Sequence, residues 1–253
     1  MFESPPTRRQ PIAAATPMGS RARRKESTRR ALLRSGRRAL ADGVADAASI
    51  HDLTHDVDVA TGSFYNHFTN KQELFAAVLA EVVDQVTQIL ETAVAGVEDP
   101  AEVVLTYLRT SSRIGFVDPD IAAIIVAEGY PILERPGILT KAMRAGIISQ
   151  RFHIHDLGAA MDLCGAVVLG ILRTWLRDQT AATQSWVDLL AEHTLVALGV
   201  PPADARQLAL APPQALPLLP PSPKDSRVGK APPCGPPISP VTADRGFDIG
   251  ARP

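Results

Sequence analysis

Apolar residues recur every three or four positions over most of the chain between residues 27 and 205, and this spacing predicts amphipathic helices. Residues that favour strands are few, and aromatic residues make up only 5% of the sequence. Proline and glycine interrupt the pattern often enough to separate one helix from the next. The sequence therefore predicts an all-α fold, with helices over residues 27–42, 71–96, 100–114, 119–128, 137–151, 156–177 and 184–198. Two shorter helices are also expected: one that starts after Ser49, which forms a capping box with Asp52, and one of about two turns near Thr61.

The two ends of the chain lack this periodicity. Residues 1–25 combine four prolines with serine, threonine and arginine, and the last part of the chain is dense in proline. Such segments bury too little apolar surface to offset the entropy of ordering them. We expect a disordered basic leader over residues 1–25 and a disordered proline-rich tail over residues 206–253, and a short turn of helix through Ala209 also fits the pattern.

The stretch from Thr61 to Leu74 predicts one short helix, a sharp break and the start of a second helix. Phe64 and Phe68 are four residues apart and share one face, so that small and polar residues occupy the other. Asn70 lies three residues before a glutamate, as an N-cap does in a capping box. A helix with an apolar back and a small polar front fits a DNA major groove, where base edges are read. The alternative is a surface helix with two core phenylalanines.

Charge is distributed unevenly along the chain. The overall formal charge is −1, but residues 1–40 carry +9 and the remaining residues carry −10. A basic end on an acidic body is typical of a protein that presents one end to nucleic acid. For the leader alone, a solvated basic tail is the alternative.

The run from Gly62 to Phe68, followed by Asn70, Lys71 and Leu74, resembles the recognition-helix signature of the TetR family of transcriptional regulators. The resemblance extends over roughly residues 27–205. It implies a helix-turn-helix DNA-binding domain over residues 26–77 and a helical domain for ligand binding and dimerisation over residues 78–205, with the boundary inside one long helix.

Three positions depart from the usual pattern of that family. Thr54 stands where a small alanine is usual, Asp58 where the turn glycine is usual, and Ala60 where a serine usually starts the recognition helix. Aspartate tolerates the left-handed backbone of such a turn better than most residues do. We therefore expect the motif to survive, with Thr61 as a replacement cap.

The DNA contacts are predicted from the positions of side chains on this motif. Those near the front of the recognition helix are expected to meet base edges, and the resemblance implies phosphate contacts for Tyr65 and His67. A lysine at the start of the next helix is expected to bind a phosphate, since the free N–H groups there also favour an anion. Arginines from Arg23 to Arg30 are expected to reach DNA as a flexible arm. The predicted DNA-binding residues are Ser49, Thr61, Gly62, Ser63, Tyr65, Asn66, His67 and Lys71.

The resemblance also implies a homodimer and a small-molecule effector. The two C-terminal helices, 156–177 and 184–198, correspond to the pair that forms the dimer interface in the family, and the alternative is that both pack inside one subunit. The candidate pocket residues are apolar or aromatic positions on the middle helices, and for each an ordinary place in the core is the alternative. They are Leu105, Tyr107, Leu108, Ile124, Tyr130, Phe152 and Trp175.

No catalytic constellation is present in the sequence: it contains no glycine-rich phosphate loop, no His-Glu-x-x-His and no nucleophile elbow. We predict a protein that is not an enzyme and uses no cofactor. His51 and His55 have metal-ligand spacing, but no partner completes a site, so surface histidines near DNA are the preferred interpretation. His153, His155 and Asp156 are likewise better explained by a helix cap at the aspartate.

Cellular location is predicted from cysteines and hydropathy. Cys164 and Cys234 have no metal or disulfide spacing, which favours a reducing compartment. The N-terminus lacks an apolar signal segment. The longest apolar run, residues 163–172, is about half the length of a membrane span. We expect a cytoplasmic protein that does not enter a membrane.

Together these patterns predict a homodimeric, TetR-like repressor that binds operator DNA and is released by a small hydrophobic ligand. A ligand-independent DNA-binding or architectural protein is the first alternative. An all-α enzyme that only borrows the helix-turn-helix shape is the second.

Overall fold

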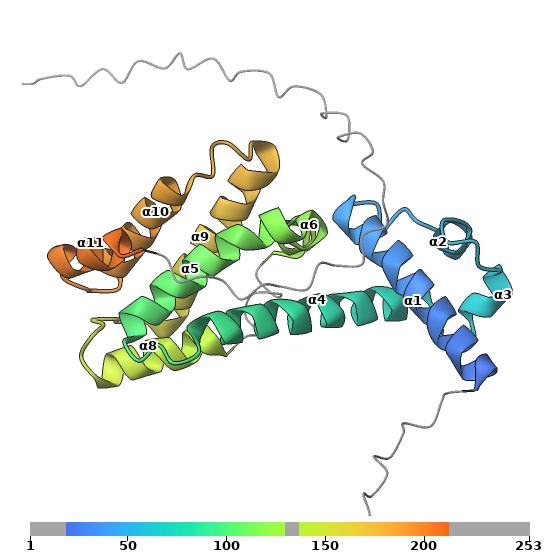
Figure 1. Ribbon diagram of the computed structural model, residues 1–253, viewed down its shortest axis with the longest axis horizontal. Coiled ribbons are helices and arrows are strands. Elements are labelled where there is room, and N and C mark those ends of the chain that lie inside the picture. Colours follow the sequence, from blue (N-terminus) through green and yellow to red (C-terminus); the bar gives the residue numbers. More distant parts are fainter. Residues whose placement is uncertain (1–18, 130–136, 213–253) are drawn as a thin grey trace, which may run out of the picture. The chain divides into compact units, whose positions relative to one another are not determined.

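The computed structural model describes residues 19–129 and 137–212, and every regular element in these two ranges is a helix (Figure 1). Tyr130, Cys234, most of the predicted leader and the proline-rich tail beyond residue 212 lie outside the described residues. The all-α prediction is confirmed. The helices are α1 (Ser20–Ala41), α2 (Ile50–His55), α3 (Thr61–Phe64), α4 (Lys71–Val94), α5 (Pro100–Val117), α6 (Pro119–Glu128), α8 (Ile138–Ile148), α9 (Leu157–Arg177), α10 (Gln184–Ala197) and α11 (Pro202–Leu210).

Helix α1 begins at Ser20, seven residues before the predicted start at Ser27. The added turns contain no proline or glycine, and they are supported by local contacts that face solvent. Glu26 accepts a hydrogen bond from Nε of Arg30 at 2.8 Å, one helical turn away. Residues 20–25 are therefore helical, although they were predicted to belong to a disordered leader. The end of α1 follows the prediction, since Gly43 takes the left-handed conformation (φ 69°) that a helix C-terminus favours.

Close packing of α1 against α4 explains the glycine in the middle of α1. A Cβ atom at Gly36 would lie 3.1 Å from Cγ of Leu74 and 3.2 Å from Cγ2 of Val78, so these α4 side chains would have to shift by a few tenths of an ångström. Glycine costs up to about 1 kcal/mol relative to alanine in a helix interior. The close approach of α1 and α4 that this glycine permits offsets the cost.

Helix α4 starts in contact with α1 and continues alongside α5 (Figure 1). Its N-cap is the predicted Asn70, whose side chain accepts a hydrogen bond from the N–H of Glu73 at 2.9 Å. The predicted capping box is not completed, because the Glu73 carboxylate accepts the N–H and the hydroxyl of Thr69 at 2.7 and 2.6 Å instead of the N–H of Asn70. The same helix thus contributes Leu74 and Val78 to the core around α1, and Val86 and Leu90 to the core around α5. This continuity is consistent with a domain boundary inside α4, which stays a prediction.

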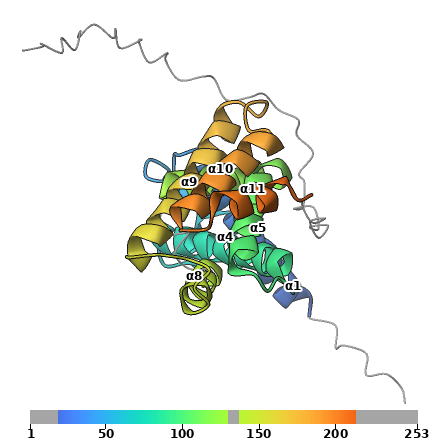
Figure 2. The same cartoon turned by 90° about the vertical axis from the view of Figure 1, so that its left-hand side faces the viewer.

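Helix α5 is the central element of the C-terminal part of the described chain. It packs against six other helices, namely α4, α6, α8, α9, α10 and α11. Figure 2 shows α10 and α11 lying together next to α5. Because it has neighbours on nearly every side, α5 is buried even at polar positions such as Thr110, Ser111 and Ser112.

The helix boundaries after α5 follow the predicted ones closely. Helix α9 is capped by Asp156, whose carboxylate accepts the N–H of Ala159 at 2.7 Å. Helix α11 is the predicted short helix. Buried Arg109 of α5 stabilises the C-terminal end of α11 by donating hydrogen bonds to the carbonyl oxygens of Ala209 and Ala211. By length and composition, α9 is the one described helix that could cross a membrane, a test that core helices of soluble proteins also pass. It packs here against α5, α6, α8 and α10.

Candidate nucleic-acid interface

The predicted recognition helix is a four-residue α-helix followed by hydrogen-bonded turns. Regular helix ends at Phe64, and the chain then continues with bonds from the N–H groups of His67 and Phe68 to the carbonyl of Phe64, at 2.9 and 3.0 Å. The element is therefore shorter in regular structure than the two turns predicted. Its direction is still maintained to Phe68, because Phe64 and Phe68 are both buried in the core.

The outer side of this element carries the predicted DNA-binding side chains. Thr61, Gly62, Tyr65 and Asn66 are exposed, and Ser63 is half-buried. Tyr65 is 60% exposed although its ring contacts Phe64 edge-on. A Cβ at Gly62 would meet no atom within 4 Å, so the front of the element is open. The geometry thus supplies a small polar surface on an apolar support, with a size and chemistry that fit a major groove.

Thr61 does not cap α3, contrary to the prediction. The N-cap residue is Ala60, which has no side-chain acceptor, and the hydroxyl of Thr61 is 3.2 Å from that of Thr54 on α2. Thr54, which stands where the family usually has alanine, thus provides a hydrogen-bond partner for the Thr61 hydroxyl, and this hydroxyl does not cap α3. Asp58 adopts the left-handed turn that was expected of it, with φ 55°.

The capping box predicted at the start of α2 is present. The Ser49 side chain accepts the N–H of Asp52, and the Asp52 carboxylate accepts the N–H and the hydroxyl of Ser49 at 2.9 and 2.6 Å. These two bonds hold the pKa of Asp52 below its ordinary value. The Ser49 hydroxyl is therefore engaged within the protein, and its predicted contact with a phosphate stays a prediction.

Lys71 is held by backbone carbonyls of the α1–α2 connection. Its Nζ donates to the carbonyl oxygens of Asp46 at 2.6 Å, Ala48 at 3.1 Å and Ala45 at 3.4 Å. These bonds occupy the N–H groups of the Lys71 ammonium that could otherwise donate to a phosphate. Lys71 thus ties the start of α4 to the segment before α2, and whether it also binds a phosphate stays a prediction.

His67 lies beside the basic N-terminal part of α1. Burial lowers its pKa, and the positive charges of Lys25 and Arg29 lower it further. The guanidinium of Arg29 is 5.4 Å from the ring centre of Phe68, so this turn of α1 is fixed against the recognition element. The basic residues here are part of a helix and not of the flexible arm that was predicted.

Comparisons with known proteins agree with this arrangement. A model of "Bacterial regulatory proteins, tetR family" matches residues 32–78, and a model of "Tetracyclin repressor-like, C-terminal domain" matches residues 99–210. The chain belongs to the TetR family. It has the DNA-binding helix-turn-helix of this family of transcription regulators, followed by the family's helical C-terminal domain. Comparison with curated proteins found no match.

Solved structures of TetR-family regulators resemble the chain over most of their length. RolR in complex with its ligand resorcinol is 27% identical with a TM-score of 0.57, and it covers 77% of this chain and 99% of its own. RolR without ligand is 26% identical with a TM-score of 0.56, covering 74% and 98%. A regulator from Marinobacter aquaeolei VT8, at 19% identity and a TM-score of 0.60, covers 70% and 98% and shares the fold.

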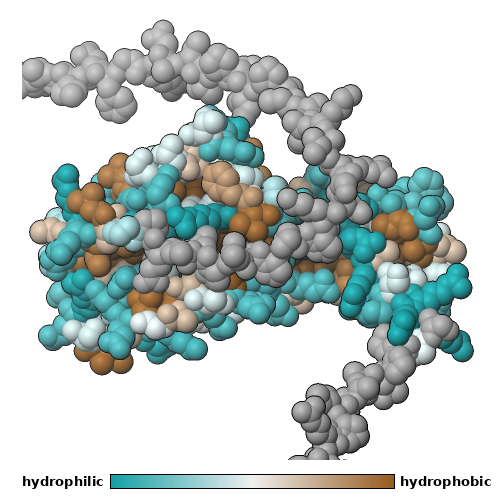
Figure 3. Space-filling model, viewed as in Figure 1, coloured by the Kyte–Doolittle hydropathy of each residue, from teal (hydrophilic) through white to brown (hydrophobic). Residues whose placement is uncertain are grey.

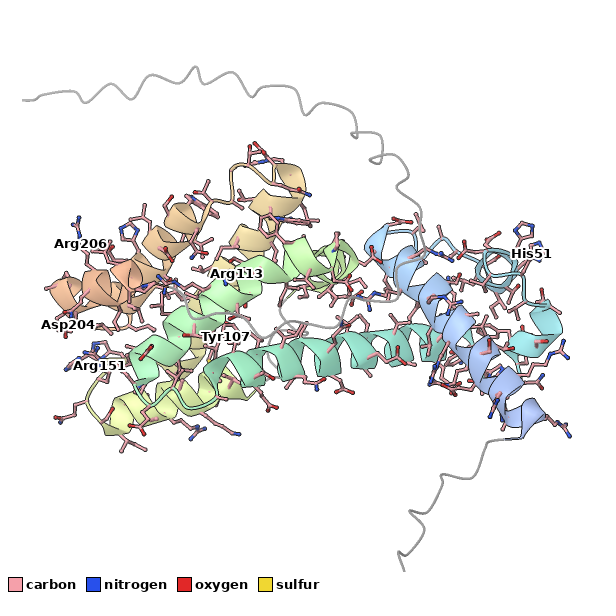
Figure 4. All side chains as sticks on the ribbon, viewed as in Figure 1. His51, Tyr107, Arg113, Arg151, Asp204 and Arg206 are labelled. Atoms are coloured by element: carbon pink, nitrogen blue, oxygen red, sulfur yellow. The ribbon has the colours of Figure 1, made fainter. Side chains whose placement is uncertain are left out.

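The candidate ligand-binding residues of this TetR-family chain are nearly all in the core. Every one except Tyr130, which lies outside the described residues, is at most 3% exposed: Leu105, Tyr107, Leu108, Ile124, Phe152 and Trp175. Figure 4 shows Tyr107 on α5, among the neighbouring helices. Burial raises the pKa of its hydroxyl, with a further contribution from Cys164, and burial alone raises the pKa of the Cys164 thiol to about 12. Tyr107 and Cys164 are therefore both uncharged at neutral pH.

Trp175 differs from the other candidates because its polar atom has no partner. The indole N–H is buried and makes no hydrogen bond in the described part of the chain. A buried donor without an acceptor costs about 1–3 kcal/mol, so such groups are uncommon in stable cores. Trp175 is the candidate with a physical reason to accept a polar partner.

The predicted absence of a metal site concerned two pairs of histidines. His51 and His55 lie on the outer side of α2 with ring centres 6.0 Å apart, and Figure 4 shows His51 pointing away from the fold. His153 has Nδ1 3.3 Å from the carbonyl oxygen of Gly199. Among the described residues, no group of three or more potential metal ligands comes together.

Proposed function

We propose that this protein is a repressor that binds an operator as a homodimer and leaves it when a small, uncharged ligand enters the C-terminal domain. The observation that carries the proposal is the recognition element, whose polar side chains are exposed on an apolar support in a chain of the TetR family. Ser49, Thr61, Gly62, Ser63, Tyr65, Asn66, His67 and Lys71 are the residues proposed to contact DNA. A regulator that acts on DNA in this way works in the cytoplasm.

An exposed apolar surface on α9 and α10 supports the homodimer. Leu176, Leu189 and Val196 are 40%, 48% and 37% exposed. Figure 3 shows hydrophobic residues over the region that α10 occupies in Figure 1. On α9 the exposed residues Ala166 and Gly170 are small and four positions apart, which lets a second helix approach closely. Two subunits joined here would present two recognition elements, as a near-palindromic operator requires.

The neutral side chains of Tyr107 and Cys164 and the unpaired Trp175 N–H support a neutral effector with a hydrogen-bond acceptor. A charged ligand would lose its hydration beside Tyr107 and Cys164, neither of which ionises at neutral pH. RolR, at 27% identity, is a regulator whose ligand is resorcinol. Small hydroxylated aromatic compounds are therefore the first class to test. The proposed contacts are the described candidate residues of the core, with Trp175 as donor.

The test is a gel shift of the full chain on the DNA that flanks its own gene, with competitor DNA, at two salt concentrations. We expect a discrete band that resists competitor, and Tyr65→Ala should weaken it while Tyr65→Phe weakens it less. Resorcinol and related phenols are then added to the complex. Release with wild type and not with Trp175→Phe would support the proposal.

Each other outcome points to an alternative. Smeared binding that salt removes would favour an architectural protein. A discrete complex that no compound in a broad screen releases would favour a ligand-independent regulator. Failure to bind DNA at either salt concentration would overturn the proposal.

A further inference from the structure

The corner where α5 meets α6 is joined to α1 by a partly buried ion pair. Asp118 ends α5 and is the N-cap of α6, where its carboxylate accepts the N–H of Ile121 at 3.3 Å. The second oxygen of the same carboxylate accepts a hydrogen bond from Arg37 of α1 at 2.7 Å. The Asp118 side chain is only 7% exposed and that of Arg37 22%, so solvent screens this pair much less than a surface pair.

Arg37 connects three helices at this point. Besides Asp118 it contacts Gln85 of α4, with Nη1 to Oε1 at 3.4 Å, and its Nε is 3.9 Å from the Asp120 carboxylate of α6. About two turns earlier in α1, Arg29 lies against the ring of Phe68 in the recognition element. Since α1 is one continuous helix, a shift of its Arg37 turn is carried to the recognition element.

The same corner is in tight contact with α9 on its other side. Gly115, three residues before Asp118, faces Trp175, and a Cβ at Gly115 would lie 2.7 Å from both Cδ2 and Cε3 of the indole. Such a distance is too short for any real carbon pair, so the tryptophan ring already touches the backbone of α5. Trp175 cannot move toward α5 without moving the end of that helix.

We propose that the α5–α6 corner is a mechanical link, in which a displacement of Trp175 is passed through Gly115 and Asp118 to Arg37 and from there to α1. The link rests on the proposed function in one respect, because effector binding is what would displace Trp175 in the cell. It assigns Arg37 and Asp118 as positioning residues: they touch neither DNA nor effector, and they set where α1 holds the recognition element.

The link can be tested without a known effector. Gly115→Ala forces the new methyl group against Trp175 and so imitates a displacement of the indole. The full chain is compared as wild type, Gly115→Ala, Arg37→Met and the double variant, by hydrogen–deuterium exchange of peptides from α1 and α2. We expect Gly115→Ala to speed exchange there by about 2- to 30-fold, and to have little further effect once Arg37 is replaced.

Two matched controls separate the link from general loss of stability. Gly146→Ala places a methyl group 2.1 Å from the ring of Phe152 in α8, a comparable clash away from the corner. Arg30→Met removes an α1 arginine whose ion pair lies within α1 itself. Neither control should reproduce the effect: Gly146→Ala should leave α1 exchange unchanged, and Arg30→Met should leave the effect of Gly115→Ala intact.

Three results would overturn the link. The first is that Gly146→Ala speeds exchange in α1 as much as Gly115→Ala does. The second is that Gly115→Ala still speeds this exchange when Arg37 is replaced by Met, and the third is that a folded Gly115→Ala protein shows no change in α1 exchange. If Gly115→Ala fails to fold, Trp175→Leu removes the same contact by shortening the side chain on α9. It is then compared with wild type, Arg37→Met and the corresponding double variant. The affinity for the DNA bound in the gel shift is measured in parallel. Lack of DNA binding by wild type would defeat the proposed function, while the exchange data would still decide the link.

Discussion

At the scale of single residues, His67 differs from the other predicted DNA contacts because its charge can change near neutral pH. Burial and the neighbouring charges of Lys25 and Arg29 lower its pKa from the ordinary value of 6.5, so the free protein carries a neutral imidazole at pH 7. A DNA phosphate beside the ring would favour the protonated form. The bound protein would then have the higher pKa at this position.

This difference predicts that DNA binding becomes tighter as pH falls. Complex formation takes up a proton at His67, so affinity should rise as pH falls through the pKa of the bound state toward the lower pKa of the free state, by up to about tenfold for a difference of one pKa unit. Fluorescence anisotropy with labelled DNA at pH 7.5 and pH 6.0, at constant ionic strength, measures the change. His67→Gln should abolish most of the pH dependence. An equally steep pH dependence in that variant would place the proton elsewhere.

At the scale of elements, Lys71 joins the start of α4 to the segment that precedes α2. Its three carbonyl partners span Ala45 to Ala48, a stretch that contains no regular helix in the described chain. The lysine therefore stabilises the placement of the segment before α2 relative to the start of α4. A role in phosphate binding would require some of these bonds to be exchanged on DNA.

Replacing Lys71 should consequently affect folding as well as binding. We expect Lys71→Met to lower the free energy of unfolding by about 1–3 kcal/mol, since hydrogen bonds from a charged donor are lost. Urea titration followed by circular dichroism measures this loss. Gln72→Met, at the exposed neighbouring position, should change it by less than about 0.5 kcal/mol. A phosphate contact would also lower the slope of binding against salt by about one, whereas an unchanged slope would mean that Lys71 acts only within the protein.

The elements were predictable to the extent that their signals are local. Asn70, Asp156 and the box of Ser49 and Asp52 lie within three residues of the groups they cap, and each was found as predicted. Helix α1 starts seven residues before the predicted Ser27, because the prolines of residues 1–17 give the whole leader the composition of a disordered segment. Thr61 was misassigned because its partner, Thr54, comes from another element.

Contacts between distant segments could not be predicted from the sequence. Arg37 and Asp118 are 81 residues apart, and each is an ordinary charged residue in its local context. The same holds for Arg109, which pairs with Asp188 of α10 and binds carbonyls at the end of α11. Figure 4 shows a further case. Arg151, which precedes α9 in the sequence, and Asp204, which follows α10, lie close together. Opposite charges are too common along this chain for spacing to identify the partners.

At the scale of the whole molecule, the proposed function depends on two copies of the chain. The apolar face of α10 should hold them together, so Leu189→Glu should convert a dimer into monomers by placing a charge in the interface. Sedimentation velocity measures the mass. Gln72→Glu, at an exposed position on α4, introduces the same charge away from this face and should leave the dimer intact. A monomeric wild type, or a dimeric Leu189→Glu, would contradict an interface at this face.

The position of the two tryptophans gives the protein an intrinsic optical reporter. The sequence contains only Trp175, buried on α9, and Trp186, half-buried on α10. Indole emission therefore originates entirely from these two C-terminal helices, and the DNA-binding helices contribute none. A molecule that reaches the buried N–H of Trp175 should therefore change the tryptophan fluorescence of an unlabelled sample. Contact of the recognition element with DNA should leave this fluorescence unchanged unless it alters the surroundings of Trp175 or Trp186.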